Sequence, residues 1–232
     1  MGKWKKWLSA GLFTAMLGTA IIAGPTADVS ANAGNKPYNI ENVSPDAQLA
    51  PSVGDSSSKT SSKAWHKIDG VCYNGSGKKV EGAITRGMDV SEWQGKINWK
   101  EAKKDLDFAF VRISYGTRHL DDYYDYNMTE AEAADVPVGT YVYSLAKTNK
   151  EALAEAQLAI RQMQGHKVSY PVAFDLEDEA TLGTLTRKEI SQIALTFCDE
   201  IRKAGYTPIL YMNLNWYNNF VDWNVLEGSG LD

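Results

Sequence analysis

Short apolar runs alternate with amphipathic stretches from residue 84 onward. Runs rich in β-branched and aromatic residues predict strands, and stretches with apolar residues three and four positions apart predict helices. Strands are predicted at Ile84–Val90, Phe108–Ile113, Val136–Tyr143, Val168–Asp175 and Thr207–Met212. Helices are predicted between them, from Asn98, over Tyr124–Ala134 and Asn149–Gln164, and from Thr186 to Gly205.

The signals at the helix ends support these assignments. Asn98 with Glu101, and Thr186 with Glu189, have the spacing of an N-cap residue and its partner three positions on. Gly165 follows the third helix as a C-terminal stop. The last helix places one apolar face toward a core, formed by Ile190, Ile193, Ala194, Phe197 and Ile201.

Strands that alternate with helices predict an α/β fold with a parallel sheet. Right-handed crossovers curl such a sheet into a barrel or leave it open and doubly wound. The loop after the first strand has no Gly-x-Gly-x-x-Gly, so nothing supports a nucleotide site. We therefore favour a TIM-like barrel over residues 84–232.

The first 33 residues have the pattern of a signal peptide. Lys3, Lys5 and Lys6 precede an uncharged apolar run that ends near Gly24, and Ala31-Asn32-Ala33 is a small-x-small cleavage site. An uncleaved membrane anchor is the alternative, because the run is nearly long enough to cross a bilayer. Either interpretation predicts export, and cleavage predicts a secreted protein without stable membrane insertion.

Two further segments precede the barrel. Residues 34–63 are polar and rich in serine and proline, which predicts a flexible linker. Residues 64–83 contain turn chemistry at Asn74-Gly75-Ser76-Gly77 between short apolar stretches, which is typical of a hairpin. The function of this extension is open.

Charge and cysteine content narrow the possible partners. Cleavage after residue 33 removes three lysines and one aspartate, which changes the net charge from −5 to −7. No basic cluster follows, which argues against nucleic acid. Export permits a disulfide between Cys72 and Cys198, but two cysteines do not decide it. The three histidines lack metal-ligand spacing, so we expect no metal. We also expect no cofactor, and we expect a monomer.

The most informative motif is the end of the fourth predicted strand, where an apolar run leads directly into acids. Side chains alternate along a strand, so Asp175 and Glu177 share one face and Phe174 and Leu176 the other. Two strand steps place the acid backbones about 6.5–7 Å apart. Two carboxyl groups at the carboxyl end of a barrel strand suit glycoside cleavage. The alternative is an ordinary solvated strand end.

Other strand ends carry candidate site residues. Asp89 ends the first strand and can share a barrel mouth with the acids of the fourth, although a turn role also suits aspartate. Candidate sugar-contacting residues are Trp93, Tyr141, Tyr143, Tyr211 and Asn213. Packing beneath the rim is the alternative for each aromatic ring.

Together these motifs resemble glycoside hydrolase family 25, the Chalaropsis-type lysozymes. The similar residues run in the family's order from about Gly87 to Trp216. They are Gly87–Gly95, Phe110–Arg112, Tyr115–Thr117, Asp122, Asn127, Val138–Tyr143, Phe174–Glu177, Gly205–Pro208 and Tyr211.

The resemblance implies a (β/α)5(β)3 barrel that cleaves the β-1,4 bond between N-acetylmuramic acid and N-acetylglucosamine in bacterial peptidoglycan. It also implies that Glu177 is the general acid/base, Asp175 the stabilising partner and Asp89 the first-strand acid. Assistance by the substrate's acetamido group and a covalent intermediate both stay open.

The resemblance further implies three strands beyond Asp232, so we expect a barrel truncated after about the fifth strand and a fragment of a longer gene product. A non-catalytic glycan-binding relative and a chitinase-like glycosidase are the competing functions. The three acids favour an enzyme, and Gly87-Met88-Asp89-Val90-Ser91 favours family 25 over a chitinase-like barrel.

Overall fold

The computed structural model describes residues 21–23 and 66–229 of the 232-residue chain. The predicted linker lies outside the described residues, and so does the predicted signal peptide apart from Ile21–Ala23. Within the described ranges, no helix combines the length and apolar character that a bilayer crossing requires.

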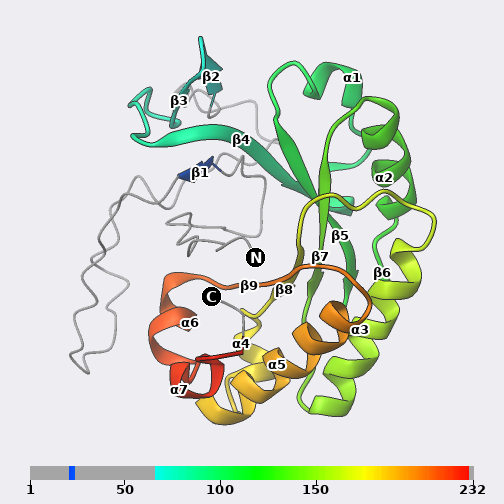
Figure 1. Cartoon of the computed structure of the whole chain (residues 1–232), viewed down its shortest axis with the longest axis vertical. Helices are drawn as coiled ribbons and strands as arrows, with labels where there is room; N and C mark the ends of the chain where they lie inside the picture. Colours follow the sequence, from blue (N-terminus) through cyan, green and yellow to red (C-terminus); the bar gives the residue numbers. More distant parts are fainter. Residues whose placement is uncertain (1–20, 24–65, 230–232) are drawn as a thin grey trace.

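Five parallel strands form one curled sheet, which has the shape of half a barrel (Figure 1). Two short strands pair antiparallel with it, β1 with β4 and β6 with β5. The parallel strands, in spatial order, are β4 (Ala83–Val90), β5 (Phe108–Tyr115), β7 (Val138–Tyr143), β8 (Val172–Asp175) and β9 (Pro208–Tyr211). The short strands are β1 (Ile21–Ala23) and β6 (His119–Leu120).

Helices follow the strands and cover the outer side of the curled sheet (Figure 1). The α-helices are α1 (Trp99–Ala102), α2 (Tyr124–Ala133), α3 (Asn149–Met163), α4 (Glu179–Leu182), α5 (Arg187–Lys203), α6 (Leu214–Asn219) and α7 (Trp223–Leu226), and a 3-10 helix, η3, spans Glu92–Gln94. The predicted caps are confirmed. The Asn98 side chain accepts a hydrogen bond from the Glu101 amide, and Thr186 forms a reciprocal capping box with Glu189.

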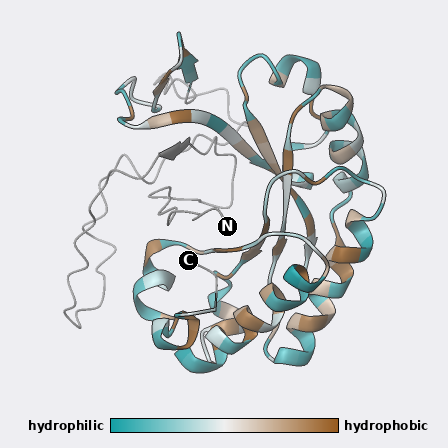
Figure 2. Ribbon diagram, viewed as in Figure 1, coloured by the Kyte–Doolittle hydropathy of each residue, from teal (hydrophilic) through white to brown (hydrophobic). Residues whose placement is uncertain are grey.

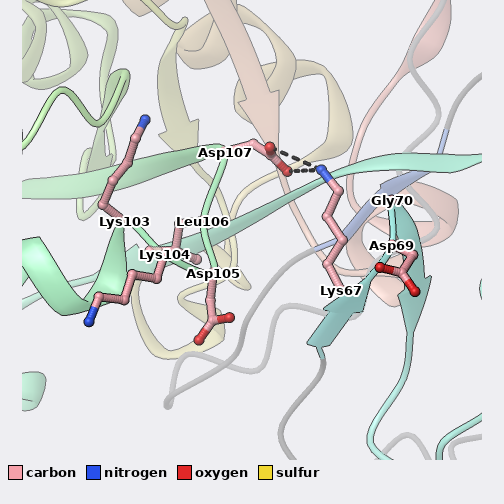
Figure 3. Close-up of a pocket in the computed structure, with 8 residues that line it drawn as sticks. All are labelled: Lys67, Asp69, Gly70, Lys103, Lys104, Asp105, Leu106 and Asp107. Carbon is pink, nitrogen blue, oxygen red and sulfur yellow. Dashed lines mark hydrogen bonds and ion pairs between the residues drawn. The ribbon is translucent and has the colours of Figure 1, made fainter.

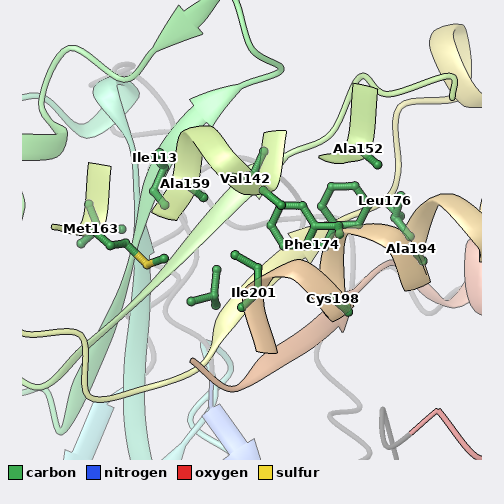
Figure 4. Packing of buried hydrophobic residues seen from close by; sticks show 14 of the residues in the cluster. Ile113, Val142, Ala152, Ala159, Met163, Phe174, Leu176, Ala194, Cys198 and Ile201 are labelled. Atoms are coloured by element: carbon green, nitrogen blue, oxygen red, sulfur yellow. The ribbon is translucent and has the colours of Figure 1, made fainter. Parts of the chain in front are cut away.

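The main core lies between the sheet and helices α3 and α5 (Figure 4). Phe174 of β8 stacks on Phe197 of α5, with ring centroids 4.0 Å apart. All five predicted apolar residues of α5 are buried. Apolar residues face inward along both helices while polar residues face solvent (Figure 2). Full burial of such a side chain stabilises the fold by roughly 1.5–3 kcal/mol, so this face fixes α5 beneath β8.

Two strands begin later than the sequence pattern predicts, and proline is the reason in both cases. Strand β7 begins at Val138 and β8 at Val172, each directly after a proline, Pro137 or Pro171. Proline has no amide hydrogen to donate to a ladder. Both prolines contribute only their carbonyl oxygens, which accept bonds from Ala109 and Thr140.

The segment before β4 forms a hairpin from β2 (His66–Ile68) and β3 (Val71–Tyr73). Its turn is at Asp69-Gly70, not at Asn74–Gly77 as predicted. Both turn residues have positive φ, as a tight two-residue hairpin turn requires. Asn74–Gly77 instead forms a second turn, which returns Lys79 to the side of Tyr73.

The hairpin contacts the amino-terminal end of the sheet. Lys67 forms an ion pair of 2.9 Å with Asp107, and Asp107 accepts the Arg86 amide at 2.7 Å. A polar pocket of about 390 Å³ lies beside this pair, lined by lysines, aspartates and the Gly70 turn (Figure 3). Because Asp107 precedes β5, this pocket is at the opposite end of the sheet from the predicted carboxylates.

Cys72 and Cys198 are both buried free thiols. Cys72 lies on β3 of the hairpin and packs with Ala83, whereas Cys198 is part of the main core. The disulfide that export would permit is therefore not formed in this structure.

Candidate active site

The carboxyl ends of the parallel strands bring the predicted site residues to one edge of the sheet. Asp175 of β8 is in register with Tyr143 of β7 and with Tyr211 of β9. Tyr143 is in turn in register with Tyr115 of β5. Four neighbouring strands therefore end at one level with an acid among three tyrosines.

The predicted alternation at the end of β8 is confirmed. Phe174 and Leu176 are fully buried in the core against the helices. Asp175 is 5% exposed on the opposite face, and Glu177 is half-buried just beyond the strand. The Leu176 amide donates to the Tyr211 carbonyl oxygen at 2.9 Å, which extends the ladder past the strand end. These acids are therefore held by the sheet and are not part of a freely solvated loop.

Asp89, Asp175 and Glu177 interact electrostatically. Burial raises the pKa of Asp89 to about 7, and the nearby Glu177 charge adds to the effect. Burial, Glu177 and Asp89 raise the pKa of Asp175 well above its usual range, against the opposing charge of Arg112. Burial also raises the pKa of Glu177. Repulsion within the cluster opposes simultaneous ionisation of all three, so the site retains a proton.

Two carboxylate oxygens of this cluster, Oδ2 of Asp89 and Oδ1 of Asp175, are buried without a hydrogen-bond partner. Buried polar atoms are normally paired in folded proteins. These two oxygens lie in one cluster at the carboxyl edge of the sheet. The unpaired oxygens therefore indicate a site built to receive hydrogen-bond donors.

Glu177 has one direct polar partner from the next strand–helix unit. The Asn213 side-chain amide donates to Glu177 Oε2 at 3.2 Å, and this bond lowers the pKa against the effect of burial. The Asn213 oxygen accepts the Trp216 amide and thereby caps α6. The cap fixes the Asn213 side chain. Asn213, which was predicted to contact sugar, therefore contacts Glu177 directly and does not lie at the rim of the acid cluster.

Arg112 anchors the other side of the cluster. Its guanidinium pairs with Asp121 and Glu92, each at 2.9 Å, and Glu92 also contacts His119 at 2.8 Å. Arg112 is the cation that lowers the pKa of Asp175. Its positive charge therefore favours negative charge on Asp175 within the acid cluster.

The predicted aromatic residues divide into separate environments. Burial is the main cause of the raised pKa of Tyr141, and the charges of Asp89 and Asp175 raise it further. Tyr141 therefore lies among the acids. Tyr143 lies beside Asp178, Asp175 and Glu177. Tyr211 ends β9 next to Asp175. Trp93 lies on η3 beyond β4 and is 74% exposed, so its ring is available to a ligand in solution.

Sequence reasoning missed Tyr115 and Asp178. Tyr115 stacks on Tyr143, with ring centroids 4.9 Å apart and planes at 15°. Both hydroxyl groups donate to Asp178 Oδ2, at 3.3 and 3.4 Å. Tyr115 ends β5 just as Tyr143 ends β7, and this shared strand-end position was the sequence signal that could have identified Tyr115 as a site residue. In the sequence, nothing distinguished Asp178 from a solvated acid of the loop after the strand.

The geometry suits acid-catalysed bond cleavage. Glu177 is half-buried with a raised pKa, which suits a proton donor, and Arg112 favours negative charge on Asp175 near a developing cation. The surrounding tyrosines and Asn213 provide stacking surfaces and hydrogen-bond groups of the kind that bind sugars.

The family model described as glycosyl hydrolases family 25 matches residues 88–229, which include all three acids. The chain belongs to this family. The half-barrel of five strands is consistent with that membership, and the hairpin at residues 66–83 lies outside the match.

Each match to an individual relative covers only part of this chain and only part of that relative. Uncharacterized protein YegX of Escherichia coli is 26% identical over 139 residues, or 57% of this chain and 49% of its own. Lysozyme M1 of Streptomyces globisporus is 38% identical over 60 residues, 25% of this chain and 20% of its own. The chain thus spans about half the length, or less, of these relatives.

The fold is also that of a solved structure, the modular autolysin LytC from Streptococcus pneumoniae in complex with a synthetic peptidoglycan ligand. The TM-score is 0.57 at 23% identity, over 67% of this chain and 39% of LytC. At this identity the comparison supports the TIM-like α/β architecture of the family 25 chain.

Proposed function

We propose that this family 25 chain carries the acid centre of a secreted lysozyme that hydrolyses bacterial peptidoglycan. The bond cleaved is the β-1,4 bond between N-acetylmuramic acid and N-acetylglucosamine. The observation that carries the proposal is the cluster of Asp89, Asp175 and Glu177, whose pKa values are all raised at one edge of the half-barrel. Similarity to Lysozyme M1 and to the peptidoglycan-bound LytC supports the substrate class.

In the proposed reaction, Glu177 protonates the glycosidic oxygen as its bond to the anomeric carbon breaks. Water then supplies the new hydroxyl at that carbon and returns a proton to Glu177. The raised pKa keeps the acid protonated closer to neutral pH than a solvated glutamate would be. Asp175, with Arg112 nearby, stabilises the positive charge that develops on the sugar. Asp89 lies close enough to influence both acids and accepts a hydrogen bond from the substrate through its unpaired oxygen.

The aromatic residues contribute binding in this proposal. Tyr141, Tyr143 and Tyr211 surround the acids from β7 and β9, and Trp93 extends the surface beyond β4. Stacking of sugar rings on aromatic faces holds the glycan while polar groups orient it. Such binding places the scissile bond next to Glu177 before proton transfer.

The test is release of new reducing ends from purified peptidoglycan, with identification of the sugar exposed. Glu177→Gln keeps the shape of the side chain but has no proton to donate, so we expect at least a 100-fold loss of hydrolysis. Glycan binding should persist. Glu179→Gln is the matched control, because that glutamate is exposed on α4 two residues away.

The outcomes separate the competing functions. Muramic acid reducing ends that depend on Glu177 establish a muramidase. Cleavage of chitin without cleavage of peptidoglycan replaces the proposal with a chitinase-like activity. Glycan binding with no hydrolysis, on this chain and on the same chain lengthened at its carboxyl end, identifies a non-catalytic relative.

A further inference from the structure

Asp178 uses its two carboxylate oxygens for different purposes. Oδ1 accepts the Thr181 amide at 2.8 Å and caps the short helix α4. Oδ2 accepts hydrogen bonds from the hydroxyls of Tyr115 and Tyr143. A helix cap needs only the first oxygen. The second joins two strands that lie 63 and 35 residues away in the sequence.

The two tyrosines are held in position to meet that oxygen. They are in register at the ends of β5 and β7, and their rings are stacked. Stacking and strand pairing fix the ring planes, so the hydroxyls converge on one point. The bond lengths of 3.3 and 3.4 Å exceed the usual O–H···O distance. Hydrogen bonds at active sites often have this geometry before substrate binds.

Glu177 lies directly between two residues that are anchored. On one side, Leu176 is buried in the core and its amide bonds to the Tyr211 carbonyl oxygen. On the other, Asp178 is held by Thr181 and by the tyrosine pair. Displacement of the Glu177 backbone would require one of these anchors to open.

Asp178 acts on the two tyrosines in addition to capping α4. Asp178 is not among the groups that shift the pKa of Glu177, whereas it does raise the pKa of both tyrosines. The charge of Asp178 therefore acts on the hydroxyl groups of Tyr115 and Tyr143.

We propose that Asp178, Tyr115 and Tyr143 form a tyrosine bracket that positions Glu177 for proton transfer. This inference rests on the proposed function, because it assigns a role in the same reaction. Asp178 and Tyr115 are positioning residues that act through the backbone on either side of the acid. Small displacements of a catalytic group reduce rate steeply, so the bracket should affect turnover more than binding.

The experiment compares Tyr115→Phe, Asp178→Asn and the double variant, using soluble peptidoglycan fragments. Tyr115→Phe removes one hydroxyl and keeps the stacked ring. Asp178→Asn keeps the helix cap, since asparagine caps as well as aspartate. The control is Tyr170→Phe, which changes a ring stacked at 4.9 Å on Phe108 at the other end of the sheet.

Tyr115→Phe should lower kcat about tenfold, the factor that corresponds to one lost hydrogen bond to a charged group. Asp178→Asn should lower kcat at least as much, because Oδ2 accepts from both tyrosines. KM should change less than about twofold, because uniform binding is retained. The double variant should be no slower than Asp178→Asn alone, since that variant already removes the oxygen to which Tyr115 donates. Tyr170→Phe should match the wild type.

Three results overturn the bracket. A raised KM with unchanged kcat in Tyr115→Phe means that the hydroxyl contacts sugar directly. Multiplicative losses in the double variant mean that Asp178 and Tyr115 act independently. A loss that tracks melting temperature, and disappears when the variants are assayed well below it, means a role in stability alone.

A second measurement judges the bracket without hydrolysis. Burial and the Asp178 charge raise the pKa of the Tyr115 hydroxyl. NMR titration of tyrosine labelled at Cζ should therefore show a lower Tyr115 pKa in Asp178→Asn than in the wild type. An unchanged Tyr115 pKa overturns the bracket. An inactive wild type with the lower pKa in the variant overturns the proposed function, and with it the positioning role, and leaves only the contact between Asp178 and Tyr115 established.

Discussion

Glu155 is a buried acid behind the site, and it provides the sharpest test of the electrostatics. The residue is 2% exposed on α3. Its carboxyl accepts the Ser144 hydroxyl at 2.8 Å and the Leu145 amide at 3.0 Å, which fixes the loop after β7. Ser144 in turn donates its amide to the Asp175 carbonyl oxygen at 2.9 Å. Glu155 thereby supports the backbone of the acid cluster.

Burial raises the pKa of Glu155 from 4.5 to about 7, despite the opposing hydrogen bonds from Leu145 and Ser144. The folded protein therefore holds this proton more tightly than the unfolded chain does. The stabilisation is complete below pH 4.5 and is lost as pH rises toward and through 7. Because one pKa unit corresponds to about 1.4 kcal/mol, the loss is about 3 kcal/mol.

Glu155→Gln removes this contribution, because glutamine does not ionise. Urea denaturation at pH 5 and pH 8 should show that the wild type loses about 3 kcal/mol more than the variant, or about 1–2 M in midpoint. The shifts of Asp89, Asp175 and Glu177 are common to both proteins and cancel. Glu130→Gln on the exposed face of α2 is the control. Parallel losses in wild type and Glu155→Gln would refute the reasoning.

Two further predictions follow from single contacts in the site and the sheet. Asn213→Ser keeps the cap of α6 but removes the amide that lowers the pKa of Glu177, so the alkaline limb of the pH–rate profile should move to higher pH. An unmoved limb would separate Asn213 from the proton donor. Gly139→Ala places a Cβ 2.6 Å from both the Phe110 ring and the Pro171 carbonyl oxygen. Overpacking of this kind should lower the free energy of unfolding by about 1–3 kcal/mol, and an unchanged denaturation midpoint would contradict it.

The α/β architecture was predictable because its signals are local. Apolar periodicity placed α5, and the capping box at Thr186 set its start. The errors were also local. Pro137 and Pro171 delayed two strands because apolar residues beside a proline resemble a strand without providing its amide bond. The Asp69-Gly70 turn was missed because the Asn74–Gly77 signal was more conspicuous.

The amino-acid sequence by itself determined which chemical groups end each strand, since strand periodicity and chain direction bring Asp89 and Asp175 to one edge of a parallel sheet. Only the tertiary structure decided which atoms meet there. Tyr115, Tyr143 and Asp178 converge from segments that are far apart in sequence, and Asn213 reaches Glu177 across 36 residues. Register, side-chain packing and burial set these contacts and the pKa values that depend on them. No local sequence pattern encodes register, side-chain packing or burial, because each depends on neighbours that come together only after the chain has folded.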